Sequence, residues 1–282
     1  MILHNEATIP GKHTRRYRTR DSHRGYPERE VEVFATPEEI EAFAKDGYLV
    51  RENLLPPEEI ARLREALEEV IAQDQHIETQ GGRAFGGIFL RHLMDKHPAF
   101  LEFLKFPPTL SVARALFGPV VQMRGFVARI CYPDAPNQET EWHFHQRVVP
   151  DPLPPLFSPP QTMDVLIYLD DVDDNNGPLC LVPGSHLWND RDLDSSRFED
   201  LPNQVVLKLA AGSCVLTSGS LWHRALPTKS GCGMRRLLLF GYSPAWLKTS
   251  IYGVKPENGL TDALLKNADE ETRELLGVAG YM

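Results

Sequence analysis

No stretch of this 282-residue sequence stays apolar over the roughly 18–20 residues that a transmembrane helix needs, so the sequence predicts no membrane span. The opening residues, MILHNEATIPGKHTRRYRTR, contain no apolar region of the kind found in a secretory signal. Cysteine is scarce: Cys131, Cys180, Cys214 and Cys232 lie far apart and form no Cys-x-x-Cys pair, a pattern that favours reduced, buried thiols. Together these absences predict a cytoplasmic protein.

The chain also lacks an excess of positive charge. Its net charge is −9, which argues against a general nucleic-acid-binding surface. Internal repeats and low-complexity segments are absent as well. What is present is a composition of 42% hydrophobic and 24% charged residues, enough for a large core on a soluble domain. The length suits one large domain or two small ones.

Three parts are expected along the chain. Residues 1–33 form a polar arm, which is either a flexible tail or a segment that docks on the body or on a second subunit, as in a homodimer. Residues 34–250 form the main domain, and residues 251–282 form a C-terminal extension. Within the main domain, helical patterns come first and strand patterns follow from about residue 119.

The first helical pattern begins at Thr36, a probable N-cap followed by Pro37 and Glu39, and it stops at Gly47. Residues 55–74 repeat apolar positions at helical spacing. A third helical zone, residues 97–118, is interrupted at Pro107-Pro108. These helices precede the strands, an order that suits an α+β chain.

The strand segments are short, rich in Val, Leu, Ile and Tyr, and bounded by Gly, Pro, Asn or Asp. They cover residues 120–133, 163–172, 177–186, 203–219 and 235–246. Between them, Asp-Asp-Asn-Asn-Gly-Pro-Leu predicts a tight turn, since Asn-Gly readily supplies a positive φ. We therefore expect a mainly β sandwich or jelly roll, buttressed by the N-terminal helices.

The sequence EWHFHQR carries the first chemical signal. His143 and His145 lie two residues apart, so on a strand both rings point to the same face and can reach one metal ion. A third ligand has to come from elsewhere, and His223 is the best candidate. Imidazole suits iron, copper, nickel or zinc. From the spacing alone, the favoured interpretation is two partly exposed strand histidines without any ion.

A second signal is Arg235-Arg236, at the start of an apolar strand. One of the two can project into a barrel mouth, where its planar guanidinium group would bind a carboxylate through two hydrogen bonds. A structural ion pair, or one arginine on each face of the strand, would give the same sequence pattern.

In order, these segments resemble the phytanoyl-CoA dioxygenase family of iron(II)/2-oxoglutarate-dependent oxygenases. The similarity rests on TPEEIEAFAKDGYLVRENLLPPEEIARLREAL, TEWHFHQ, YLDDVDDNNGPLCLVPGSH and WHRALPTKSGCGMRRLLLFGY. It implies a double-stranded β-helix, Fe(II), 2-oxoglutarate and O2 as cofactors, and oxidation of a small organic molecule. It also implies that His223 is the distal iron ligand and that Arg235, with Arg236 as the alternative, binds 2-oxoglutarate.

One position departs from the family pattern of His-x-Asp. Matching on Trp142 places His143 at the histidine and His145 at the aspartate. Matching on His-Gln-Asp instead places His145 at the histidine and Arg147 at the aspartate, where an arginine cannot ligate. The first alignment gives a triad of His143, His145 and His223 without a carboxylate. A further alternative is that Glu141 or Asp164 supplies an oxygen ligand or a hydrogen bond to an imidazole.

The substitution leaves three functions open. The protein is a 2-oxoglutarate-dependent oxygenase, a three-histidine metalloenzyme that works without 2-oxoglutarate, or a binding protein on a degenerate oxygenase scaffold. Arg147 and Trp142, beside the histidines, are candidates for substrate contact. The proline-rich segment 148–161 corresponds in position to a loop that covers the pocket. His186, in Pro-Gly-Ser-His, is expected to be structural.

Overall fold

The structure is a computed structural model that describes the chain apart from residues 21–22, 24, 26, 74–77, 81–86, 134–137, 146–151, 153, 157, 159–160, 189–196, 249–256 and 280–282. Two antiparallel sheets form the centre of the main domain. The larger has seven strands in the order β3-β10-β7-β12-β6-β5-β4, and the smaller has three in the order β11-β8-β9. This is the predicted jelly roll, in which two sheets face each other.

The strands of the large sheet are β3 (Tyr48–Arg51), β4 (Glu78–Gln80), β5 (Gly87–Arg91), β6 (Val121–Cys131), β7 (Met163–Tyr168), β10 (Cys214–Ser218) and β12 (Arg235–Pro244). Those of the small sheet are β8 (Leu179–Leu181), β9 (Val205–Leu207) and β11 (His223–Ala225). Each predicted strand segment contains at least one of these strands, and residues 203–219 contain both β9 and β10. The sequence did not indicate β3, β4, β5 or β11, which are too short to show a clear alternation.

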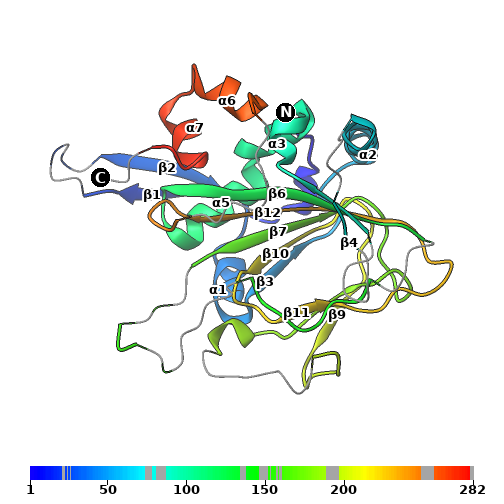
Figure 1. Ribbon diagram of the computed structural model, residues 1–282. Helices are drawn as coiled ribbons and strands as arrows, with labels where there is room; N and C mark the ends of the chain where they lie inside the picture. The colour runs from blue at the N-terminus through cyan, green and yellow to red at the C-terminus, as the bar shows by residue number, and fades with distance from the viewer. Residues whose placement is uncertain are drawn as a thin grey trace.

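Helices cover the outer face of the large sheet. The α-helices are α1 (Pro37–Asp46), α2 (Pro57–Gln73), α3 (Leu93–Lys96), α4 (Pro98–Leu101), α5 (Pro107–Phe117), α6 (Leu260–Leu265) and α7 (Glu270–Leu275). Short 3-10 helices are η1 (Glu6–Thr8), η2 (Glu102–Lys105) and η3 (Ser185–Leu187). Figure 1 shows α3, α6 and α7 on one side of the large sheet, with β9 and β11 on the other. Within the described ranges, no helix has the length and apolar character to cross a bilayer.

The helix boundaries follow from local sequence. Thr36 caps α1: its hydroxyl accepts from the Glu39 amide, and the Glu39 carboxylate accepts from the Thr36 amide. Gly47 ends the helix with φ of 84°, a left-handed conformation that glycine adopts without strain. Helix α5 begins at Pro107, as the interruption predicted, because proline is favoured in the first turn and excluded from the interior.

Strand β7 shows how the core divides. Met163, Val165 and Ile167 pack in the main core with the helices, whereas Leu166 and Tyr168 pack toward the small sheet with Leu179 and Leu181. Successive side chains on a strand point to opposite faces. The face of β7 that carries Asp164, Leu166 and Tyr168 therefore looks into the space between the sheets, where the candidate site lies.

The two terminal segments pack on the body. In residues 1–33, strands β1 (His13–Arg18) and β2 (Glu28–Val33) form a hairpin. Tyr17 Oη donates to the Arg114 carbonyl of α5 at 2.6 Å, and Ile2, Ile9, Val31 and Val33 join the main core. At the other end, Leu275 of α7 is buried in the same core.

Candidate metal centre and cavity

Three histidines from two distant segments converge between the sheets. His143 and His145 come from the segment after β6, and His223 opens β11. One nitrogen from each ring lies within 4.8 Å of the others, and the ring centroids are 4.4 Å apart for His143–His223 and 4.7 Å for His145–His223. The side chains predicted from sequence are therefore brought together.

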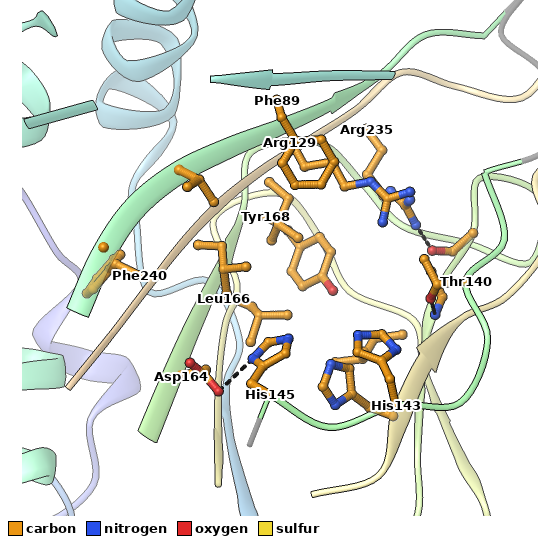
Figure 2. Close-up of a pocket in the computed structure, with 18 of the residues that line it drawn as sticks. Phe89, Arg129, Thr140, His143, His145, Asp164, Leu166, Tyr168, Arg235 and Phe240 are labelled. Atoms are coloured by element: carbon orange, nitrogen blue, oxygen red, sulfur yellow. Dashed lines mark hydrogen bonds and ion pairs between the residues drawn. The ribbon is translucent and has the colours of Figure 1, made fainter. Parts of the chain in front are cut away.

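Backbone hydrogen bonds hold the two segments side by side. The His143 amide donates to the His223 carbonyl at 3.0 Å, and the His223 amide donates back at 2.9 Å. The His145 amide donates to the Gly219 carbonyl at 2.8 Å. The segment is extended, with a single bridge at His143 rather than a full strand, yet residues 143 and 145 still point the same way (Figure 2).

Each ring is anchored through Nδ1. The acceptors are the Glu141 carbonyl for His143 at 2.8 Å, the Leu221 carbonyl for His223 at 2.9 Å, and Asp164 Oδ2 for His145 at 2.8 Å. Carbonyl and carboxylate oxygens only accept, so each Nδ1 carries the proton. Each neutral ring then has its lone pair on Nε2, which is the usual arrangement of a metal-ligating histidine with an oriented partner.

The electrostatic setting keeps His223 neutral. Burial lowers its pKa well below the usual value, and the neighbouring rings of His143 and His145 lower it further, against the opposing hydrogen bond to Leu221. A neutral imidazole is the form that ligates a metal. The burial that would penalise a free imidazolium therefore favours the ligating form.

The histidines lie at a cavity of about 500 Å³, a size that suits a small molecule. Its floor is built from three rungs of neighbouring residues on β7, β12 and β6. The pairings give Tyr168–Leu237–Arg129, then Leu166–Leu239–Val127, then Asp164–Gly241–Arg124. The middle rung is apolar, and the outer rungs carry the charges.

Two arginines lie together at the end of the cavity away from Asp164, as Figure 2 shows for Arg129 and Arg235. Burial lowers the pKa of Arg129, and the nearby positive charge of Arg235 adds to this effect. An arginine stays protonated in a protein, so both remain cationic. The two neighbouring positive charges make this end suited to a carboxylate.

Arg235 is oriented by the Asn-Gly-Pro-Leu turn. It is 4% exposed, donates through Nη1 to the Gly177 carbonyl, and has Nη2 3.3 Å from Cys131 Sγ. Gly177 has φ of 74°, and a Cβ there would lie 2.6 Å from Arg235 Nη1. The turn residue predicted from Asn-Gly thus also provides the close approach of backbone to guanidinium.

Arg236 points to the opposite face. Its Nη1 donates to Asp170 Oδ1 at 2.8 Å, and its Nη2 lies 3.5 Å from Glu68 Oε1 of α2. It therefore forms the structural ion pair that the sequence left open for one of the two arginines. Arg235 faces the cavity and Arg236 faces the helix layer.

Tyr168 lies between the arginines and the histidines in Figure 2. Burial raises its pKa to about 12, so the hydroxyl remains protonated and can donate. The sequence did not single out Tyr168, Arg124 or Arg129. The available signal was the pair of arginines in the mainly apolar segment VQMRGFVARIC.

The remaining predicted residues lie elsewhere. Trp142 is 4% exposed; its Nε1 donates to the Glu199 carbonyl at 2.7 Å, and Arg224 lies over its ring, so it is packed beside the cavity rather than lining it. His186 Nε2 bonds the Ala44 carbonyl of α1 at 3.0 Å, outside the cavity. Arg147 lies outside the described residues, as does most of segment 148–161.

A family model described as phytanoyl-CoA dioxygenase (PhyH) matches residues 43–237, which include the three histidines and Arg235. Among curated proteins, ectoine dioxygenase of Bordetella bronchiseptica is 28% identical over 157 residues, covering 53% of this chain and 49% of that protein. L-proline trans-4-hydroxylase of Streptomyces griseoviridis is 27% identical over 146 residues, covering 51% and 52%. The chain thus spans about half the length of these curated relatives.

Among solved structures, HygX from Streptomyces hygroscopicus with nickel and 2-oxoglutarate bound matches with a TM-score of 0.60. The identity is 19%, and the match covers 79% of this chain and 92% of that one. At this identity the likeness concerns the fold, and it agrees with the two facing sheets described above. Because the family model covers well over half of the sequence, the chain belongs to the phytanoyl-CoA dioxygenase family.

Proposed function

We propose that the protein is a non-haem iron oxygenase that uses 2-oxoglutarate and O2 to oxidise a small organic molecule. The observation that carries the proposal is the histidine cluster: three rings with Nδ1 engaged and ligating nitrogens within 4.8 Å of one another. The same cavity is lined by Arg129 and Arg235, so a metal site and a carboxylate site would share one cavity.

His143, His145 and His223 would hold the metal. The donor set fits iron, because neutral imidazole suits iron, copper, nickel or zinc, whereas magnesium and calcium prefer oxygen. When bound, iron(II) with 2-oxoglutarate and O2 supplies the oxidising power that protein side chains lack. Asp164 would orient His145 and balance part of the metal's charge from one residue away.

The co-substrate would lie between the metal and the arginine end. Arg235 would bind its far carboxylate through the guanidinium group, and Arg129 would add a second positive charge. The Tyr168 hydroxyl would donate a further hydrogen bond. Leu166, Leu237 and Leu239 line the floor and would keep water from the reacting atoms.

The substrate class follows only coarsely from the relatives. Their names say that they act on ectoine and on L-proline, both small molecules. The cavity of about 500 Å³ has room for a molecule of that size beside 2-oxoglutarate. We therefore assign this chain a small organic substrate.

Iron and 2-oxoglutarate binding test this function directly. The purified protein should take up about one equivalent of iron(II), and His143→Ala, His145→Ala and His223→Ala should each abolish tight uptake. His186→Ala is the matched control, since His186 lies outside the cavity. Iron-loaded protein should bind 2-oxoglutarate and release succinate during turnover. Full metal occupancy in all three variants would refute the site.

The absence of a carboxylate ligand favours one alternative. Replacing the usual acid by neutral His145 makes the metal site more positive by one charge, and a three-histidine site can act without 2-oxoglutarate. Substrate oxidation or rearrangement without succinate release would identify this second function. Iron uptake would be the same in both cases, so the two are separable.

Three expectations outside the site stay predictions. They are a homodimer through residues 1–33, a cytoplasmic location, and a division of the chain at residues 33 and 250. The hairpin β1–β2 presents exposed charges, with Arg16 Nη2 2.5 Å from Glu30 Oε1. Light scattering of the full chain, compared with an Arg16→Glu variant of the exposed hairpin, measures the oligomeric state.

A further inference from the structure

Positive charge is unevenly distributed around the cavity. Of the described residues that line it, four are arginines, Arg91, Arg124, Arg129 and Arg235, and one is an acid, Asp164. The acid is engaged by His145. Two of the arginines, Arg129 and Arg235, lie at the end proposed for 2-oxoglutarate. The other two have no role in that proposal.

Arg124 reaches the cavity because strand β6 contains a bulge. The register with β12 runs from Phe126–Phe240 to Arg124–Gly241, which leaves Gly125 as an extra residue. Gly125 has φ of 48°, the left-handed conformation of a glycine bulge. On a regular strand residue 124 would share the core-facing side of Phe126. The bulge instead turns Arg124 onto the same side as Val127 and Arg129.

The guanidinium of Arg124 has no partner within the described part of the chain: it makes no hydrogen bond or ion pair there. Arg124 is also half-buried, so its charge is partly removed from water. A guanidinium group that faces a cavity keeps its hydrogen-bond donors available to a ligand when no protein group accepts from them. A ligand that brings a negative group would satisfy it.

The position of Arg124 separates it from the 2-oxoglutarate end. Arg124 and Asp164 lie on the same rung, with Gly241, which has no side chain, between them. The backbones of Arg124 and Asp164 are therefore two strand spacings apart, about 10 Å. Arg129 lies two rungs along the same strand, about 13 Å away. The apolar rung of Leu166, Leu239 and Val127 therefore lies between Arg124 and the Arg129–Arg235 end.

We infer that Arg124 forms a second anion subsite, which selects a substrate bearing a carboxylate on an apolar frame. This rests on the proposed function for the place of the oxidised carbon, near the histidines. A single guanidinium fork matches a carboxylate through two parallel hydrogen bonds. The described lining residues lie on strands and loops, so the helix N-terminus that often binds phosphate is not offered among them.

Binding of simple carboxylates tests the inference without turnover. The protein is loaded with nickel(II) and saturated with 2-oxoglutarate, which fills the Arg129–Arg235 end. Calorimetry then compares hexanoate with neutral hexanamide, because the two ligands share one apolar chain and differ in charge. Hexanoate should bind at least about tenfold more tightly than hexanamide, a difference of about 1.4 kcal/mol.

Variants assign that preference to one residue. R124Q should weaken hexanoate by about ten- to thirtyfold while changing hexanamide and 2-oxoglutarate by less than about twofold, as expected for loss of one charged contact. R124K should retain part of the preference because it keeps the charge. R16Q is the matched control, since Arg16 lies on the exposed hairpin and should leave all three affinities unchanged.

Three results would overturn the inference: no preference for hexanoate in the parent protein, an unchanged preference in R124Q, or tighter binding of hexyl phosphate than of hexanoate. Failure of nickel or 2-oxoglutarate binding would instead count against the proposed function. In that event the hexanoate and hexanamide comparison, repeated on the protein alone with R124Q, still decides the subsite.

Discussion

Asp164 accepts a hydrogen bond from Nδ1 of His145, with Oδ2 2.8 Å from the nitrogen. The His-x-Asp position has no aspartate, but the carboxylate of Asp164 lies beside the site. It contacts the ring of His145 on the Nδ1 side, away from the nitrogen that would ligate the metal. It comes from β7 of the large sheet, whereas the segment that carries the histidines bridges to β11 of the small sheet. Asp164 therefore acts on the site by orienting the ring of His145 and by placing a negative charge beside it.

Removing this acid should weaken metal binding without unfolding the protein. Asp164→Ala should lower metal affinity by about 10–100-fold, the usual effect of losing a partner that orients a ligating histidine. Asp164→Asn should lose less, because the amide oxygen can accept the same hydrogen bond. Metal titration with nickel(II) measures both, and Asp174→Ala, an exposed position, is the control. Equal losses in the Ala and Asn variants would exclude an orienting role.

The fold should not accommodate a side chain at Gly241, even the methyl group of alanine. A Cβ at this position would lie 2.9 Å from Asp164 Oδ1 and 2.8 Å from the Met163 carbonyl. Gly241→Ala should therefore displace Asp164, destabilise the fold by about 1–3 kcal/mol and weaken metal binding. Gly233→Ala is the matched control, because its Cβ would meet only Asn176 Nδ2 at an ordinary 3.8 Å. Denaturant unfolding and nickel titration give the two readouts, and normal values of both would contradict the close contact.

Arg235 and Arg236 should separate into a binding role and a structural role. Arg235→Leu should weaken 2-oxoglutarate by about 2–5 kcal/mol, the usual cost of leaving a buried charge pair half made. Arg236→Leu should leave that affinity unchanged and lower stability by about 1–2 kcal/mol, because Asp170 keeps Arg64, whose Nη2 lies 2.8 Å from Asp170 Oδ1. Calorimetry and thermal unfolding of the two variants measure this division. A reversed order of 2-oxoglutarate affinities would mean that the arginines have exchanged roles.

Acid should weaken the fold through Glu39. Burial opposes ionisation of this carboxyl, but the hydrogen bonds from Arg51 and from the Thr36 amide outweigh it and lower its pKa. Arg51 is 5% exposed, and its Nη2 donates to Glu39 Oε2 at 2.9 Å. Because the folded-state pKa lies below the unfolded value of about 4.3, this stabilisation is present above that pH and is lost as the pH falls through the folded pKa.

Glu39→Gln isolates the charge, since glutamine can still close the capping box of α1. The variant should be about 1–2 kcal/mol less stable than the parent at pH 7, and the difference should shrink as the pH falls below about 4. Urea unfolding at several pH values measures it. Glu41→Gln, on the exposed side of the same helix, should track the parent throughout. A constant difference at every pH would show that the ion pair does not carry the effect.

Local sequence determined several helix boundaries and the shared direction of two histidines. The caps of α1 and the start of α5 were predictable because capping bonds and proline sterics involve neighbours in the chain. The same holds for His143 and His145 sharing a direction, which needs only two residues of extended backbone. Recognising His223 and Arg235 depended on ordered segments that resemble one family.

Only the tertiary structure decided the surroundings of these residues. Successive residues of a strand alternate, so Arg235 and Arg236 lie on opposite faces. Which of the two faces the cavity depends on which face of the sheet the helices cover. Asp164 meets His145 only because the two sheets close on each other. Arg124 lines the cavity because Gly125 shifts the register of β6 against β12. Strand pairing and sheet packing join residues far apart in the sequence, and no local pattern fixes that register.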